Sequence, residues 1–165
     1  MKSDGPLYVY LPDGVSFVSQ KATKIRTIYF PLCGPTFRSI KSSITPYLSG
    51  DIKIDQHSYL TKPASREDLR HIVRNFFAFI EGKGIFSIAQ DSDGGDSYVE
   101  IGPLWHRLVK HFPQVGLALE AFNFVPITGE NVELMRVTVR NVGRQKLQIT
   151  PTVAIPIFAR ALINK

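Results

Sequence analysis

The sequence predicts an all-β fold, mainly antiparallel, arranged as a β-sandwich with one short helix near residues 65–72. Three observations favour this class. Apolar and polar residues alternate with a period of two in most runs, which is typical of strands that bury one face. Glycine, proline, asparagine and aspartate separate these runs at short intervals. Only one stretch carries the pattern of a helix start. We therefore expect about ten strands in a single domain that spans residues 1–165.

Four runs in the first third of the chain are expected to be strands: Leu7–Leu11, Val15–Ser19, Ile25–Phe30 and Gly50–Asp55. Pro31 should end the third run because proline cannot donate a hydrogen bond to a β-ladder. In the fourth run Ile52 and Ile54 share one face, and the residues that alternate with them are charged. That run therefore predicts a strand with one side toward a core and the other toward water.

The predicted helix starts at Ser65, which stands in N-cap position with Asp68 three residues later. The serine hydroxyl can accept from the first helical turn, and acidic residues suit the positive end of the helix dipole. After this short helix, aromatic and branched residues favour a strand over Arg74–Glu81. The tripeptide Gly82-Lys83-Gly84 then predicts a tight hairpin to a second strand, Ile85–Ala89.

The second half of the chain is expected to consist of strands over Ser97–Ile101, Leu104–Phe112, Gln114–Val125, Val132–Asn141, Lys146–Thr150 and Thr152–Leu162. Within Val132–Asn141 the alternation changes phase, because Val132 and Leu134 share one face whereas Met135 starts the other. A β-bulge near Leu134 would explain this change, and so would a strand buried on both faces. Both interpretations stay open at this point.

The amino-acid composition restricts the kinds of protein that this chain can be. Of the 165 residues, 44% are hydrophobic, which argues against disorder and allows a sizeable core. The single cysteine, Cys33, cannot form an internal disulfide, and we expect it to be a small structural residue beside a turn. No apolar run reaches the roughly 18 residues that span a bilayer, and the first residues lack the apolar core of a secretion signal. We therefore expect a cytoplasmic protein without a membrane partner.

The formal net charge of +6 invites a nucleic-acid interpretation, but the basic residues are dispersed. The tightest basic group, formed by Arg66, Arg70, His71 and Arg74, is interrupted by two acids. The sequence contains no arginine-rich arm and no zinc-finger pattern. We therefore expect no nucleic-acid partner.

The acidic loop Asp91–Asp96 suggests a calcium site, but the EF-hand pattern requires a glutamate at the twelfth position. Counting from Asp91, that position is Gly102, so the pattern fails. The histidines His57, His71 and His111 are scattered without metal-ligand spacing. We therefore expect no metal and no cofactor, and we interpret the acidic loop as a solvated turn.

Catalytic patterns are also missing from the sequence. Glycosidic chemistry uses two carboxylates that face each other across a cleft. Asp51 and Asp55 stand at the ends of one short strand, and Glu100 and Glu120 are isolated in the sequence. No phosphate-binding loop, dinucleotide fingerprint or nucleophile elbow occurs. We therefore assign no catalytic residue.

The most ligand-like motif is the triplet Trp105-His106-Arg107, our candidate carbohydrate-binding site. A tryptophan can stack on a sugar face, and histidine and arginine can hydrogen-bond to hydroxyls or phosphate. On a strand, however, Trp105 and Arg107 point to one side and His106 to the other. The alternative interpretation is that one of these faces belongs to the core or to an interface.

Several blocks of the sequence resemble the N-terminal region of glycoside hydrolase family 94. This family contains cellobiose and chitobiose phosphorylases and was formerly called glycosyltransferase family 36. The resemblance extends over most of the chain, from about Tyr29 to Arg160, and is carried by the blocks Tyr29–Gly34, Ser43–Lys53, Arg74–Phe77, Glu100–Arg107 and Phe124–Val139. The resemblance implies a β-sandwich of the galactose-mutarotase-like supersandwich type, of which this chain would be a part. It also implies an (α/α)6 barrel as the catalytic partner. The family's catalytic aspartate and phosphate-binding residues belong to that barrel, so none can be placed in this chain.

Three functional hypotheses follow. The first is a non-catalytic N-terminal sandwich domain of a phosphorylase-like protein, which serves in domain packing, dimer contacts and the rim of the substrate site. It predicts self-association or contact with a barrel domain, because unpaired strand edges and apolar faces need cover. The second is a stand-alone carbohydrate-binding module with an oligosaccharide partner. The third is a mutarotase-like or phosphorolytic fragment, for which His57 or His106 with Glu100 are the nominal acid and base.

Overall fold

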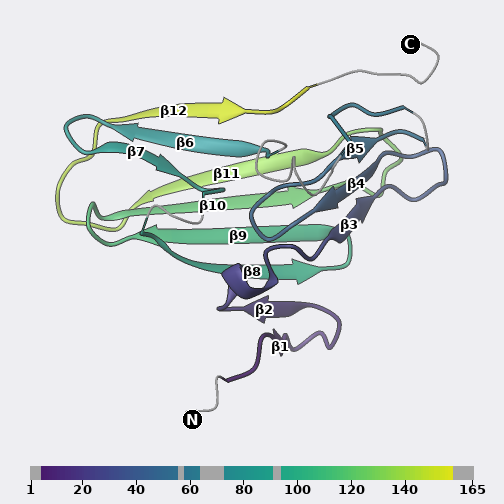
Figure 1. The fold of residues 1–165 in the computed structure, drawn as a ribbon, viewed down its shortest axis with the longest axis horizontal. Coiled ribbons are helices and arrows are strands. Elements are labelled where there is room, and N and C mark those ends of the chain that lie inside the picture. Colours follow the sequence, from purple (N-terminus) through teal and green to yellow (C-terminus); the bar gives the residue numbers. More distant parts are fainter. Residues whose placement is uncertain (1–4, 56–57, 64–72, 91–93, 158–165) are drawn as a thin grey trace.

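The computed structural model describes residues 5–55, 58–63, 73–90 and 94–157. In this part of the chain nearly all regular structure is antiparallel β, arranged as twelve strands in three sheets (Figure 1). The all-β, antiparallel class predicted from the sequence is confirmed, and the packed sheets are consistent with a sandwich. The predicted helix at 65–72, His57, His71 and the first half of the acidic loop lie outside the described residues. Among those described, no helix has the length and apolar character needed to cross a bilayer.

The largest sheet has six strands in the order β1-β2-β8-β9-β10-β11. Their bounds are Val9–Tyr10 (β1), Phe17–Ser19 (β2), Asp96–Gly102 (β8), Trp105–Phe112 (β9), Leu117–Phe124 (β10) and Leu134–Asn141 (β11). The last four strands pair in sequence order as an antiparallel meander, and the sequence predicts a strand at each of these positions. Short β1 and long β11 are its two edges; in Figure 1, β1 is at the bottom and β11 lies directly above β10.

The two smaller sheets have three strands each. One has the order β12-β6-β7, with β6 over Asn75–Ile80, β7 over Gly84–Ser87 and β12 over Ile149–Ala154. The other has the order β3-β4-β5, with β3 over Phe30–Cys33, β4 over Lys41–Ile44 and β5 over Ile52–Lys53. The predicted hairpin between β6 and β7 is confirmed. β12 pairs with β6 inside the molecule, so the last described strand finds its partner within the chain.

One hydrophobic core joins the three sheets. Its largest fully buried apolar side chains are Phe112, Leu32, Ile40, Ile44, Leu48, Ile80, Ile88, Leu108, Leu117 and Leu119. On β9 and β10 they occupy alternate positions, so Leu108 and Leu119 face inward while their neighbours face out. Each such side chain contributes about 1.5–3 kcal/mol when fully buried. The core therefore fixes which face of the large sheet stays available to solvent.

The prediction for Ile25–Phe30 is wrong in most of its length. Residues Ala22–Ile25 form a 3-10 turn (η1), and the strand begins only at Phe30 and continues through Pro31. Proline is tolerated there because β3 is an edge strand, where one row of backbone groups needs no partner. β4 was not predicted from the sequence, because its residues Lys-Ser-Ser-Ile contain only one apolar side chain. Its buried positions are Ser42 and Ile44.

The phase change near Leu134 has a simpler origin than either predicted explanation. β11 starts at Leu134 and pairs with β10 residue by residue from Phe124↔Leu134 to Leu117↔Asn141. No bulge interrupts this register, and no residue of β11 is fully buried. Val132 lies in the preceding loop and therefore does not take part in the alternation.

Candidate functional site

The structure separates the triplet Trp105-His106-Arg107 as strand alternation predicts. Trp105 and Arg107 lie on the outer face of the six-stranded sheet and are partly exposed, whereas His106 points inward and is fully buried. Two of the three candidate residues are thus brought together, and His106 is placed on the opposite face. We call the outer face around Trp105 and Arg107 the β9 face.

Three aromatic rings form a row on the β9 face. Trp105 stacks on Phe122 with ring centroids 5.8 Å apart and planes inclined by 27°, and Phe122 contacts Phe124 at 5.5 Å. The guanidinium of Arg136 lies 5.3 Å from the centroid of Phe122. The register explains the row, because Trp105 is opposite Phe124, and Arg107 is opposite Phe122. Each aromatic contact contributes about 0.5–1.5 kcal/mol beyond area burial, so the row is a preorganised surface.

Arg107 holds two carboxylates beside this row. Its Nη1 donates to Glu100 Oε2 at 2.7 Å and its Nη2 donates to Glu120 Oε2 at 2.8 Å. Glu100 is directly opposite Arg107 on β8, and Glu120 comes from β10. The two glutamates that the sequence analysis treated as isolated therefore meet at one guanidinium. Cross-strand register in the two hairpins was the signal that could have found them.

The charges around Glu120 and Arg107 shift the pKa values of both groups. Burial by itself raises the pKa of Glu120, but the hydrogen bond and charge of Arg107, with the charges of Arg140 and Arg136, outweigh it. The pKa of Glu120 therefore lies below its ordinary value. Burial likewise opposes the charge of Arg107, yet the bonds to Glu120 and Glu100 raise its pKa. A carboxylate that stays ionised at neutral pH cannot serve as a general acid.

Two hollows extend along the same face of the sheet. The smaller, of about 80 Å³, is lined by Tyr98, Arg107, Val109, His111, Ala118, Leu119, Glu120, Thr138 and Arg140. The larger, of about 390 Å³, is lined by Gln20, Ala22, Thr23, Gly95, Asp96, Ser97, Tyr98 and His111. Tyr98 and His111 line both hollows, so the two adjoin. Hydroxyl, carboxylate, imidazole and guanidinium groups thus lie on the same face as an aromatic row, the combination that sugar rings and their hydroxyls require.

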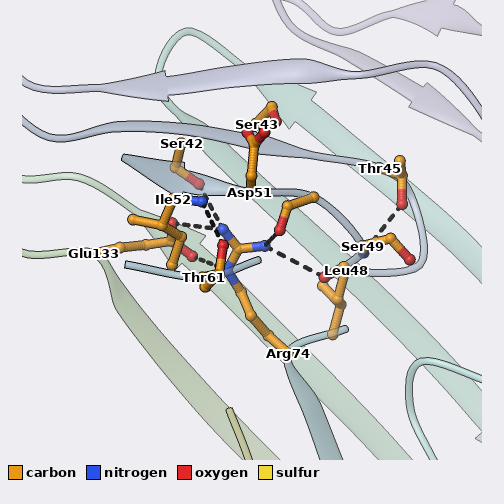
Figure 2. A network of polar contacts seen from close by, with 11 residues as sticks. Ser42, Ser43, Thr45, Leu48, Ser49, Asp51, Ile52, Thr61, Arg74 and Glu133 are labelled. Carbon is orange, nitrogen blue, oxygen red and sulfur yellow. Dashed lines mark hydrogen bonds and ion pairs between the residues drawn. The ribbon is translucent and has the colours of Figure 1, made fainter. Parts of the chain in front are cut away.

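A second arginine cluster lies inside the protein, where the three sheets meet (Figure 2). The Nε of Arg74 lies 2.5 Å from Glu133 Oε1, and its Nη2 donates to Glu133 Oε2 at 3.0 Å and to Ser42 Oγ at 2.6 Å. Its Nη1 donates to the carbonyls of Gly50 (3.2 Å) and Leu48 (3.4 Å). Both charged side chains are almost fully buried. These contacts tie β6 to the β3-β4-β5 sheet and to the loop before β11.

The inward face of the large sheet also carries His106 and Asn123, which are opposite each other on β9 and β10. Both are fully buried, and their side chains make no well-formed hydrogen bond to another described residue. Burial and the charge of Arg74 lower the pKa of His106 to about 3. His106 is therefore neutral in the folded protein and is not placed to act on a ligand at the β9 face.

The other residues considered as candidates, Asp51, Asp55 and Cys33, have surroundings that indicate a role in the fold. Asp51 accepts a hydrogen bond from Ser43 Oγ at 2.8 Å, and Asp55 accepts from the backbone and hydroxyl of Ser58 at 2.8 and 3.0 Å. Cys33 is a half-buried free thiol in β3. Within the described residues no group of three His, Cys, Asp or Glu side chains is placed to hold a metal ion.

No protein-family model matches this sequence, and no curated protein matches it significantly. Any functional proposal must therefore be argued from the geometry of the described surfaces and from the sequence blocks that resemble glycoside hydrolase family 94.

Proposed function

We propose that the chain is a non-catalytic β-sandwich domain of a carbohydrate phosphorylase-like protein and that it acts through contacts with a second copy or with a catalytic barrel domain. The observation that carries this proposal is an apolar surface at the β1 edge of the large sheet. Four consecutive residues, Leu7 to Tyr10, are each 46–60% exposed although all are apolar or aromatic. We call them the β1 surface.

Contacts between aromatic rings hold the tyrosines of the β1 surface in place. Tyr8 lies 5.6 Å from Tyr10 and 5.2 Å from Phe17, which in turn lies 5.7 Å from Phe30 of β3. The aromatic cluster thus reaches from the core to solvent. Contiguous exposed apolar residues on a sheet edge are typical of protein interfaces, and tyrosines are frequent anchors in them. The resemblance to the family's N-terminal sandwich supports the same function.

Sedimentation velocity tests this proposal. The wild-type chain is expected to self-associate at tens of micromolar, roughly the range in which exposed apolar surfaces drive association. The double substitution Tyr8→Ser/Tyr10→Ser should weaken association roughly tenfold or more, because buried tyrosine anchors often contribute 2 kcal/mol or more. Ile127→Ser, at another exposed apolar residue, in the β10–β11 turn, is the control and should change nothing. A wild-type chain that remains monomeric, and that also fails to bind a barrel domain of the family, would contradict the proposal.

A second candidate function, carbohydrate binding, is favoured by the aromatic row on the β9 face. Trp105 is the only tryptophan, so its emission reports directly on this surface. Titration with cello- and chito-oligosaccharides should give a saturable emission change, and Phe122→Ala should weaken it. Phe37→Ala, which removes an exposed ring in the β3–β4 loop, is the control. An emission that no glycan alters would remove this candidate.

The third hypothesis, retained enzymatic activity, gains no support from the β9 face. Both carboxylates there are held by Arg107, and His106 is on the buried side. Phosphate release or uptake with cellobiose as substrate is expected to be absent for this chain alone. Turnover that survives repurification would show that the non-catalytic part of the proposal is wrong.

A further inference from the structure

The edge opposite the β1 surface carries a row of backbone groups that no other described strand pairs with. Within the described residues, β11 ends the six-stranded sheet and pairs only with β10. Just beyond the strand, Val142 N donates to Gly116 O at 2.8 Å, which sets the phase of the ladder. Because hydrogen-bonded and non-hydrogen-bonded pairs alternate in an antiparallel ladder, the backbone groups of Met135, Val137 and Val139 point away from β10. These residues therefore present donors and acceptors to an incoming strand.

The side chains of the same residues border an open part of the core. Met135, Val137 and Val139 lie on the inner face, opposite the buried Asn123, Ala121 and Leu119 of β10. Val137 packs against the core together with Ile149 of β12, but Val139 is 37% exposed, and Val153 of β12 is 54% exposed. An added strand beside β11 would therefore cover apolar side chains that β11 leaves partly exposed.

The outer side of this edge is positively charged. From Leu134 to Ile157 the sequence contains four cations, Arg136, Arg140, Arg144 and Lys146, and no acidic residue. Arg136 is 68% exposed and lies 3.6 Å from Glu120 Oε1, whose other oxygen is held by Arg107. The charge of Arg140 also acts on Glu120, so this one glutamate is opposed by three arginines on this part of the sheet. The excess charge favours a partner that brings carboxylates to the outer face.

We propose that the β11 edge binds an extended segment of a protein partner in which apolar and acidic residues alternate. In a strand with a period of two, one set of side chains would cover Val137 and Val139 on the inner face. The other set would meet Arg136 and Arg140 on the outer face. This interaction is separate from the proposed association through β1, because the two edges lie at opposite ends of the sheet.

The test uses a fluorescently labelled eight-residue peptide that alternates glutamate and valine, blocked at both ends, and a matched peptide with lysine in place of glutamate. Anisotropy and backbone amide spectra are recorded for the full chain. The glutamate peptide should bind and shift the amides of Met135, Val137 and Val139, and the lysine peptide should not bind. Arg136→Glu/Arg140→Glu should weaken the glutamate peptide by roughly tenfold or more and allow the lysine peptide to bind. Arg26→Glu/Arg38→Glu, two exposed cations elsewhere, is the charge-matched control.

A second variant separates binding from folding. Val139→Pro removes one backbone donor that points away from β10, so the sheet should keep its far-ultraviolet spectrum while peptide binding is lost. Equal binding of both peptides, or amide shifts confined to β1, would overturn the proposal. The proposal would also be overturned if, without any peptide, the amide signals of Val137 and Val139 shifted as the protein concentration was raised. Such shifts would show that a second copy of the chain occupies the β11 edge.

Discussion

Two arginines of this protein each bind carboxylates, but in different surroundings. Arg74 is 3% exposed and links the start of β6 to β4 through Ser42, to the loop before β11 through Glu133, and to the β4–β5 connection through two carbonyls. Arg107 is 30% exposed and binds two glutamates from adjacent strands of one sheet. A buried charge cannot be left unpaired without a large cost, whereas an exposed pair is screened by water. The comparison indicates that the Arg74 cluster maintains the fold, whereas the Arg107 cluster is partly accessible to solvent.

The strongest test of this difference is Arg74→Met, which leaves Glu133 buried without its partner. We expect a loss of about 3–5 kcal/mol in the free energy of unfolding. The double substitution Arg74→Met/Glu133→Leu should recover a large part of this loss, because no charge then remains buried. Urea denaturation of the three proteins measures both values. A loss below about 1 kcal/mol in the single variant would show that the cluster is no more important than a surface pair.

His106 extends the comparison to pH, because its pKa is lowered to about 3 by burial and by the charge of Arg74. The ordinary pKa of histidine is about 6.5, so below that pH the unfolded chain binds a proton that the folded protein does not. His106 therefore lowers stability progressively as pH falls from about 6.5 toward 3, at up to about 1.4 kcal/mol per pH unit. At pH 5 the deficit should be about 2 kcal/mol.

The variant His106→Leu isolates this contribution. The difference in unfolding free energy between variant and wild type should grow as pH falls from 7 to 5 and should be flat above pH 7. His111→Leu, which changes an exposed histidine of the same strand, is the matched control. Parallel pH profiles for wild type and His106→Leu would refute the assignment of a neutral buried imidazole.

Two leucines with left-handed backbone provide a third comparison. Leu48 (φ 64°) is fully buried beside Arg74, and Leu104 (φ 63°) is partly exposed in the turn before Trp105. Left-handed backbone is strained for leucine, so Leu104→Gly should stabilise the protein by up to about 1 kcal/mol. Leu48→Gly relieves the same strain but removes a fully buried side chain and should destabilise it. Thermal unfolding of both variants gives the signs, and a stabilising Leu48→Gly would contradict this account of the core.

The cluster around Arg107 on the β9 face was easier to predict from the sequence than the buried cluster around Arg74. Alternation along β9 correctly placed Trp105 and Arg107 on one face and His106 on the other. Glu100 could have been added from the short turn between β8 and β9, since hairpin register follows from turn length. The contact between Arg74 and Glu133, in contrast, joins residues 59 positions apart and depends on how three sheets meet. No local pattern encodes such a contact.

The contrast between local alternation and contacts that are distant in the sequence also explains the errors in the predicted strands. The long strands of the large sheet were predicted as strands from their apolar and polar patterns, although their pairing was not predicted. β4 was missed because its buried Ser42 is polar and is satisfied by Arg74, a partner that the sequence does not reveal. Ile25–Phe30 was wrongly predicted as a strand because its apolar residues serve a turn and an edge, where Pro31 is allowed. Tertiary contacts, in both cases, outweighed local preference.

The smallest expected effect concerns Arg107 itself. Arg107→Met should cost less than about 1 kcal/mol at physiological salt, since the guanidinium is partly exposed and its ion pairs are screened. It should nevertheless raise the pKa of Glu120, because the hydrogen bond and charge of Arg107 help to hold that pKa down. Carboxyl titration by NMR detects this change, and Arg38→Met is a control at an exposed arginine elsewhere. A loss as large as that of Arg74→Met would mean that the β9 face is part of the folding core, and the case for a binding surface there would lose its physical basis.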